Sequence, residues 1–123
     1  MNVTIYHHPG CSKSRKTLEI IESHGHKPRI VEYLKNPPAP DTLLRLAELL
    51  GVPLGELLRT SEADFADAPE TVPADDGEAL SRWLHDHPRV LQRPIVVDDD
   101  TNRAVIGRPP ENVLELIGAL PRE

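Results

Sequence analysis

Apolar, β-branched residues gather in four short runs along the chain, and each run predicts a strand. Residues 2–7 and 29–34 form the first two. The runs 95–97 and 103–106 flank a polar segment of aspartates, threonine and asparagine, a pattern typical of an antiparallel hairpin. The strands therefore fall near the two ends of the chain, with a long helical segment between them.

Helical spacing of apolar positions, together with start and stop signals, predicts helices over 12–23, 41–50, 53–58, 77–87 and 111–120. Asp41 is expected to cap the second helix, while Gly25 and Gly51 follow the ends of the first two. The acidic residues 60–77 are interrupted by prolines and predict a loop or loose helix. The residues expected to face the core from helix 77–87 are Leu80, Trp83 and Leu84.

This order of elements is the order of a thioredoxin-like α/β domain. Such a domain has a mixed four-stranded sheet flanked by helices, and here a helical insertion at about 40–88 separates the second and third strands. A chain of 123 residues suits a single domain, 1–123, with one core.

Charge and composition exclude several classes of function. The formal net charge is −6, whereas nucleic-acid binding needs a basic surface. No apolar run approaches the ~20 residues of a membrane span, and no secretory signal is visible at the N-terminus. The single cysteine cannot form an internal disulfide. We therefore expect a cytoplasmic protein that binds neither nucleic acid nor membrane. Nothing in the sequence suggests an obligate dimer, so we also expect a monomer.

That cysteine, Cys11, lies between the first strand and the first helix. A thiol at a helix N-terminus faces unpaired N–H groups and the positive end of the helix dipole, which favour the thiolate. Lys13, Arg15 and Lys16 add positive charge in the first turns. Many free cysteines are only small buried hydrophobes. The polar, cationic flank favours a reactive thiol instead.

Spacing excludes two familiar kinds of cysteine site. A phosphatase loop of the form Cys-x5-Arg would need arginine where Thr17 stands, and a Cys-x-x-Cys motif would need a thiol where Ser14 stands. Any disulfide that Cys11 forms must therefore be resolved by a thiol from another molecule.

The six histidines do not predict a metal site. His7 and His8 are adjacent in a predicted strand and point to opposite faces, and the other pairs have an i,i+2 spacing near helix ends. His7 lies four residues before Cys11, where it either tunes the thiol or simply packs in the core.

Arg59, Arg93 and Arg108 each stand beside a turn or an element end. The planar donor fork of arginine suits tetrahedral oxyanions, so a thiolate with converging arginines would accept an anionic electrophile. In a thioredoxin-like topology Arg93-Pro94 would approach Cys11. Singly, each arginine could equally serve only to keep the surface soluble.

Five segments resemble the glutaredoxin-linked arsenate reductase (ArsC) family, in order and over nearly the whole chain. They are IYHHPGCSKSR (5–15), YLKNPP (33–38), LLR (57–59), RPIVV (93–97) and GRPPE (107–111). The family usually has Asn where His8 stands. The GRPPE segment resembles a subgroup often encoded outside arsenic-resistance clusters.

The resemblance implies a catalytic nucleophile at Cys11, with His7 and Ser14 modulating the thiolate. It implies oxyanion binding by Arg59, Arg93 and Arg108, places Arg15 in the same anion-binding turn, and implies a cis-proline at Pro94. The implied reaction reduces arsenate through a covalent adduct on Cys11. Glutathione is then a co-substrate and glutaredoxin a partner, with no tightly bound cofactor and no metal.

Two other functions remain open on the sequence. A thiol-disulfide oxidoreductase of the same fold would act on glutathione mixed disulfides, although disulfide exchange gains little from three arginines. Spx-type regulators share the fold and bind RNA polymerase, commonly with a Cys-x-x-Cys switch that Ser14 removes here.

Overall fold

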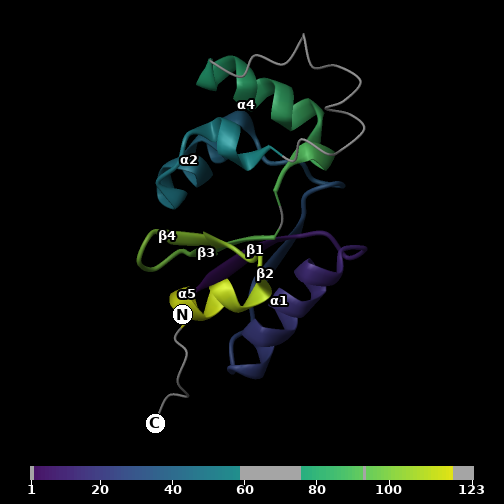
Figure 1. Cartoon of the computed structure of the whole chain (residues 1–123), viewed down its shortest axis with the longest axis vertical. Coiled ribbons are helices and arrows are strands. Elements are labelled where there is room, and N and C mark those ends of the chain that lie inside the picture. Colours follow the sequence, from purple (N-terminus) through teal and green to yellow (C-terminus); the bar gives the residue numbers. More distant parts are fainter. Residues whose placement is uncertain (1, 59–75, 93, 118–123) are drawn as a thin grey trace. The chain divides into compact units, whose positions relative to one another are not determined.

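The structure of the chain is a computed structural model (Figure 1). It describes residues 2–58, 76–92 and 94–117. Its elements, in chain order, are β1 (Val3–His7), α1 (Ser12–Ser23), β2 (Arg29–Glu32), α2 (Pro40–Leu50), the 3-10 helix η1 (Leu54–Leu57), α4 (Gly77–Asp86), the 3-10 helix η3 (Pro88–Val90), β3 (Ile95–Asp98), β4 (Arg103–Ile106), the 3-10 helix η4 (Pro110–Val113) and α5 (Leu114–Ile117). In the described residues, no helix is long and apolar enough to span a membrane.

The strands form one four-stranded sheet of order β2-β1-β3-β4. β1 pairs in parallel with β2 and antiparallel with β3, and β3 pairs antiparallel with β4. The sheet is therefore mixed, and the α/β fold is thioredoxin-like with helices between β2 and β3, as predicted. Tyr6 pairs with Ile95, and Ile95 pairs with Ile106. Consequently the end of β1, the start of β3 and the end of β4 lie side by side at one edge of the sheet, the edge formed by the ends of these strands.

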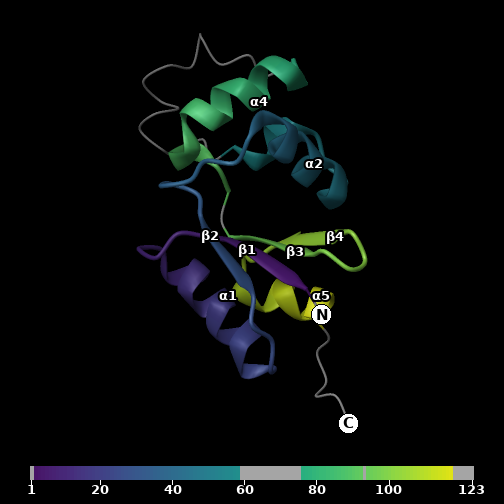
Figure 2. The ribbon, with the colours of Figure 1, turned by 180° about the vertical axis from the view of Figure 1, so that it is seen from behind.

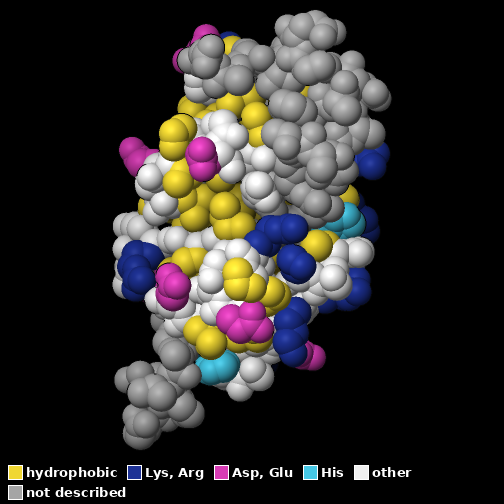
Figure 3. Space-filling view, in the orientation of Figure 1, with side chains coloured by type: hydrophobic (Ala, Val, Ile, Leu, Met, Phe, Trp, Pro, Cys, Tyr) yellow, Lys and Arg dark blue, Asp and Glu magenta, His cyan; other side chains and the backbone are white. Residues whose placement is uncertain are grey.

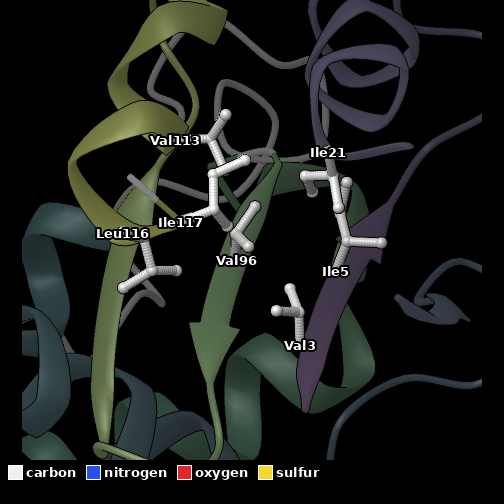
Figure 4. Packing of buried hydrophobic residues seen from close by; sticks show 7 residues of the cluster. All are labelled: Val3, Ile5, Ile21, Val96, Val113, Leu116 and Ile117. Atoms are coloured by element: carbon white, nitrogen blue, oxygen red, sulfur yellow. The ribbon is translucent and has the colours of Figure 1, made fainter. Parts of the chain in front are cut away.

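Contacts divide the chain into two compact units, Met1–Glu32 with Arg93–Glu123, and Tyr33–Gln92. The prediction of one domain over 1–123 stays a prediction. In the first unit, α1 and α5 cover the same face of the sheet (Figure 2). The buried core between them consists of Val3, Ile5, Ile21, Val96, Val113, Leu116 and Ile117 (Figure 4). Val3, Ile5 and Val96 point into this core from β1 and β3, because side chains alternate between the two faces of a sheet. The remaining core residues come from the helices that cover this face.

The second unit is helical, with α2 packed against α4 and η1. Leu43, Leu46, Leu80 and Leu84 are buried there. The bridge between Leu58 and Leu91 joins the two ends of this unit, and the Gln92 N–H donates to the Leu57 carbonyl at 2.7 Å.

Three sequence predictions need correction. Ala39, not Asp41, is the N-cap of α2, because Pro40 can occupy the first helical position, where no N–H is needed. The second strand ends at Glu32, since Tyr33 begins a turn. Trp83 is only partly buried and stacks on His87 with ring centroids 4.3 Å apart.

Other boundaries agree with expectation. Gly25 and Gly51 adopt positive φ angles of 85° and 73° after the first two helices. The last helix starts as 3-10 from Pro110 and continues as α5. Most of the acidic segment 60–77 and the end of the predicted helix 111–120 lie outside the described residues.

Candidate active site

The loop from His8 to Cys11 connects the end of β1 with the start of α1. The Cys11 N–H donates to the His8 carbonyl at 3.0 Å, which closes a turn around Pro9 and Gly10. Cys11 itself is the N-cap of α1, with extended backbone angles of φ −98° and ψ 123°. The Arg15 N–H donates to the Cys11 carbonyl at 3.0 Å and starts the helical ladder. The thiol is partly exposed. It therefore stands where the helix dipole favours negative charge.

Positive charge surrounds this helix start, and the first turn of α1 contains no acidic residue. The Arg15 guanidinium donates to the Pro9 carbonyl at 2.8 Å, so it lies against the loop that carries Cys11. Lys16 is ion-paired with Glu19 at 2.8 Å. Lys and Arg side chains gather over the N-terminal half of α1 (Figure 3). The environment suits both a thiolate and an approaching anion.

Beneath the loop, His7 and Ser14 meet in the buried layer between β1 and α1. His7 is 6% exposed and Ser14 is fully buried. His7 Nδ1 lies 2.7 Å from Ser14 Oγ, and the His8 N–H donates to the same oxygen at 3.0 Å. Burial lowers the pKa of His7; the positive charge of Arg15 lowers it further, and Glu32 and Glu22 oppose both effects. The imidazole is therefore neutral near pH 7.

The tautomer of His7 decides what the Ser14 hydroxyl does. If Nδ1 accepts, the single Ser14 hydrogen is used on His7. If Nδ1–H donates, Ser14 Oγ accepts from both His7 and the His8 N–H, and its hydrogen is released for another acceptor.

Arg108 follows β4 at the same edge of the sheet. The Gly107 N–H donates to the Pro94 carbonyl at 2.9 Å, and the Arg108 N–H donates to the Ile106 carbonyl at 2.9 Å. A Cβ on Gly107 would lie 2.6 Å from Thr17 Oγ1 of α1 and 2.9 Å from Pro94 Cγ. Only glycine fits this close approach between α1 and the two strands.

The Arg108–Pro109 peptide bond is cis. The cis-proline implied at Pro94 involves Arg93, which lies outside the described residues.

Of the predicted site residues, the structure brings Cys11, His7, Ser14 and Arg15 together around one loop. Arg108 lies at the same edge of the sheet, and Arg59 and Arg93 lie outside the described residues. Sequence reasoning missed the side chain of His8, whose Nδ1 accepts from the Gly10 N–H at 3.1 Å. The turn signal Pro9-Gly10 directly after a histidine could have indicated it. Among the described residues, no group of three or more His, Cys, Asp or Glu side chains could hold a metal ion.

These features define a thioredoxin-like protein with a single thiol at the N-terminus of its first helix. The model of the ArsC family matches residues 6–116, so the chain belongs to the ArsC family. The chain is 41% identical to the protein YfgD of Escherichia coli K12 over 94% of this chain and 97% of that protein. It is 36% identical to an arsenate reductase of the same organism, covering 94% of this chain and 81% of the relative.

A solved structure gives the same picture. The arsenate reductase from Vibrio cholerae superposes with a TM-score of 0.86 at 38% identity, covering 94% of this chain and 97% of that one.

Proposed function

We propose that this protein is an arsenate reductase in which Cys11 is the nucleophile and glutathione and glutaredoxin supply the electrons. The observation that carries this proposal is the position of Cys11 as the N-cap of α1, with no acidic residue in the first turn. Both the dipole and the nearby cations favour a thiolate there. The likeness to arsenate reductases of Escherichia coli and Vibrio cholerae supports arsenate as the electrophile.

Substrate binding would rely on arginines, because a dianion must approach an anionic sulfur. Arg15 already lies against the loop of Cys11 through its bond to Pro9. Arg108 stands at the same edge of the sheet. We propose that both bind the oxyanion together with Arg59 and Arg93. Each guanidinium offers paired donors that match the oxygens of a tetrahedral anion.

The first chemical step forms a sulfur–arsenic bond. The Cys11 thiolate attacks arsenic, and an oxygen of arsenate leaves as hydroxide and is protonated to water. The neutral His7 and the buried Ser14 beneath the loop would modulate the charge on Cys11. Arsenic remains in the +5 state in this adduct.

Reduction then needs an external thiol, since the chain has one cysteine. The glutathione thiolate attacks Cys11 Sγ, a disulfide forms, and the electron pair of the sulfur–arsenic bond stays on arsenic. Arsenic thereby reaches the +3 state and leaves as arsenite. A glutaredoxin thiolate next attacks the glutathione sulfur of the mixed disulfide and releases the Cys11 thiolate. We expect a cytoplasmic monomer, in keeping with the reduced thiol that this cycle needs.

The direct test is arsenate-dependent oxidation of NADPH, coupled through glutathione, glutaredoxin and glutathione reductase. Turnover that disappears in Cys11→Ser, while the variant keeps its melting temperature, would support the proposal. Turnover that persists in Cys11→Ser would overturn the role of Cys11. A wild-type chain that reduces glutathionylated peptide but not arsenate would favour the oxidoreductase alternative.

The arginine at position 108 offers a sharper test of oxyanion binding. Arg108→Lys keeps the charge but loses the paired donors, so KM for arsenate should rise by about tenfold. Arg103→Lys is the matched control, because the exposed Arg103 donates to the Glu115 carbonyl at 3.2 Å. Equal KM values for both variants would exclude Arg108 from the binding site.

A further inference from the structure

His8 holds the turn before Cys11 through both its backbone and its side chain. Its N–H donates to Ser14 Oγ at 3.0 Å, and its carbonyl accepts from the Cys11 N–H at 3.0 Å. The ring adds a third bond, because Nδ1 accepts from the Gly10 N–H at 3.1 Å. The side-chain bond thus lies inside the turn that the backbone bond from Cys11 to His8 already closes.

The chemistry of the ring follows from that third bond. A ring nitrogen that accepts carries no proton, so His8 is neutral with its hydrogen on Nε2. The oxygen of an asparagine amide reaches the same place, since asparagine side chains accept from the N–H two residues later in Asx turns. His8 therefore acts here as an acceptor, and an amide is its closest replacement.

Gly10 gives an independent indication of how closely the ring packs on the turn. A Cβ on Gly10 would lie 2.9 Å from His8 Cε1 and 3.5 Å from His8 Nδ1. Gly10 is not among the glycines with positive φ, which in the described part of the chain are Gly25 and Gly51. Its backbone would therefore accept a side chain, and the His8 ring is what excludes one.

We propose that His8 is a positioning residue, whose neutral imidazole fixes the turn and so places Cys11 at the N-cap of α1. This rests on the proposed function only in taking Cys11 as the reactive group. Without the ring acceptor, the Gly10 N–H would turn to water and the turn would open more often. The thiol would then spend less time in line with the helix dipole, and its thiolate would be less favoured.

A purely electrostatic role of His8 would give a different result for the asparagine variant. A charged imidazole would favour the thiolate by attraction, and asparagine could not replace it. Among the described residues, the titratable or charged groups close to the turn include His7, Cys11 and Arg15, and they stay unchanged in the variants below. The comparison of asparagine with alanine at position 8 therefore separates the two roles.

The experiment measures the rate at which iodoacetamide alkylates Cys11, as a function of pH and without arsenate. His8→Asn should stay within about twofold of wild type at neutral pH, and His8→Ala should slow alkylation by about fivefold and raise the midpoint of its pH profile. His26→Ala is the matched control, at the other end of α1. Slowing in His8→Asn equal to that in His8→Ala would overturn the proposal, as would wild-type rates in His8→Ala.

A double-mutant cycle adds a second readout. Gly10→Ala should slow alkylation in the wild-type background, where the new Cβ meets the His8 ring, and much less in His8→Asn, which lacks Cε1. Additive effects would mean that the ring and Gly10 do not interact and would contradict the proposal. Arsenate turnover is recorded separately. If wild type fails to reduce arsenate, the proposed function fails while the alkylation result still decides the role of His8.

Discussion

His7 Nδ1 and Ser14 Oγ lie 2.7 Å apart in the buried layer between β1 and α1. The same Ser14 oxygen accepts the His8 N–H at 3.0 Å, so one hydroxyl joins the strand end, the loop and the helix. Because both side chains are buried, this contact satisfies polar atoms that have little or no access to water.

Removing the hydroxyl in Ser14→Ala should destabilise the protein by about 1–3 kcal/mol, because the buried His7 Nδ1 and the partly buried His8 N–H both lose this partner. It should also slow alkylation of Cys11. Ser23→Ala is the control on the same helix, where an exposed hydroxyl donates to the Ile20 carbonyl at 2.9 Å. Chemical denaturation measures both variants. Equal free energies of unfolding would show that the buried hydroxyl is not special.

The lowered pKa of His7 predicts a pH dependence of stability. The unfolded chain, whose His7 has the ordinary pKa of 6.5, binds the proton more readily than the folded chain does. The contribution of His7 is therefore complete above pH 6.5 and is lost as the pH falls toward the lowered folded-state pKa, by at most about 1.4 kcal/mol per pH unit.

Unfolding of wild type and His7→Asn, followed between about pH 5 and 8, measures this contribution. The difference in unfolding free energy between the two should decrease toward acid, since the variant cannot take up this proton. The other histidines are present in both proteins and cancel. A difference that stays constant across this range would mean that His7 is charged in the folded state as readily as in the unfolded one.

Gly107→Ala should destabilise the protein by about 1–3 kcal/mol, because the new Cβ would meet Thr17 Oγ1 at 2.6 Å and Pro94 Cγ at 2.9 Å. Adding Thr17→Ala removes the first of these contacts and should restore part of the loss. Gly77→Ala is the control, since its Cβ would meet only Leu44 Cδ2 at 3.7 Å. Thermal melting compares the variants. No recovery in the double variant would exclude Thr17 as the obstacle.

Asp76 and Asp41 both lie at the start of a helix, but only Asp76 is an N-cap, so their alanine variants can be compared. Asp76 caps α4, where Oδ1 accepts from the Glu78 N–H at 3.1 Å and the Ala79 N–H at 3.2 Å. Asp76→Ala should therefore cost about 1 kcal/mol of unfolding free energy. Asp41 lies inside the first turn of α2 and is not its cap, so Asp41→Ala should cost less, up to about 0.5 kcal/mol from the helix dipole. Urea denaturation measures the order of the two effects, and a larger loss at Asp41 would contradict it.

Local signals explain why much of the fold could be predicted from the sequence. Gly25 and Gly51 end their helices at positive φ, a conformation that other residues avoid, and the β-branched runs became β1, β3 and β4. The prediction that Asp41 caps α2 was wrong, because Asp41 and Pro40 are neighbouring signals for two different helix starts. A proline at the first helical position moved the helix start back to Ala39.

The candidate site was only partly predictable, for a different reason. Cys11, His7 and Ser14 lie in one short stretch of the sequence, residues 7–14, so their proximity follows from a strand, a turn and a helix in succession. The packing of Gly107 against Thr17 joins residues 90 positions apart and depends on how α1 crosses the sheet. The bond from Gly10 to the His8 ring depends on a rotamer that no sequence pattern specifies.

The sheet order has a consequence for the synthesis of this protein. Of the four strands of this sheet, β1 leaves the ribosome before the others, yet it lies between β2 and β3 in the finished sheet. Its second neighbour is β3, Ile95–Asp98, so one side of β1 stays without its strand partner until these residues have been made. Nascent chains that end before Ile95 contain the loop of Cys11 but lack the strand that completes the sheet on that side of β1. Cys11 is therefore synthesised before β3, the strand that completes the sheet beside β1.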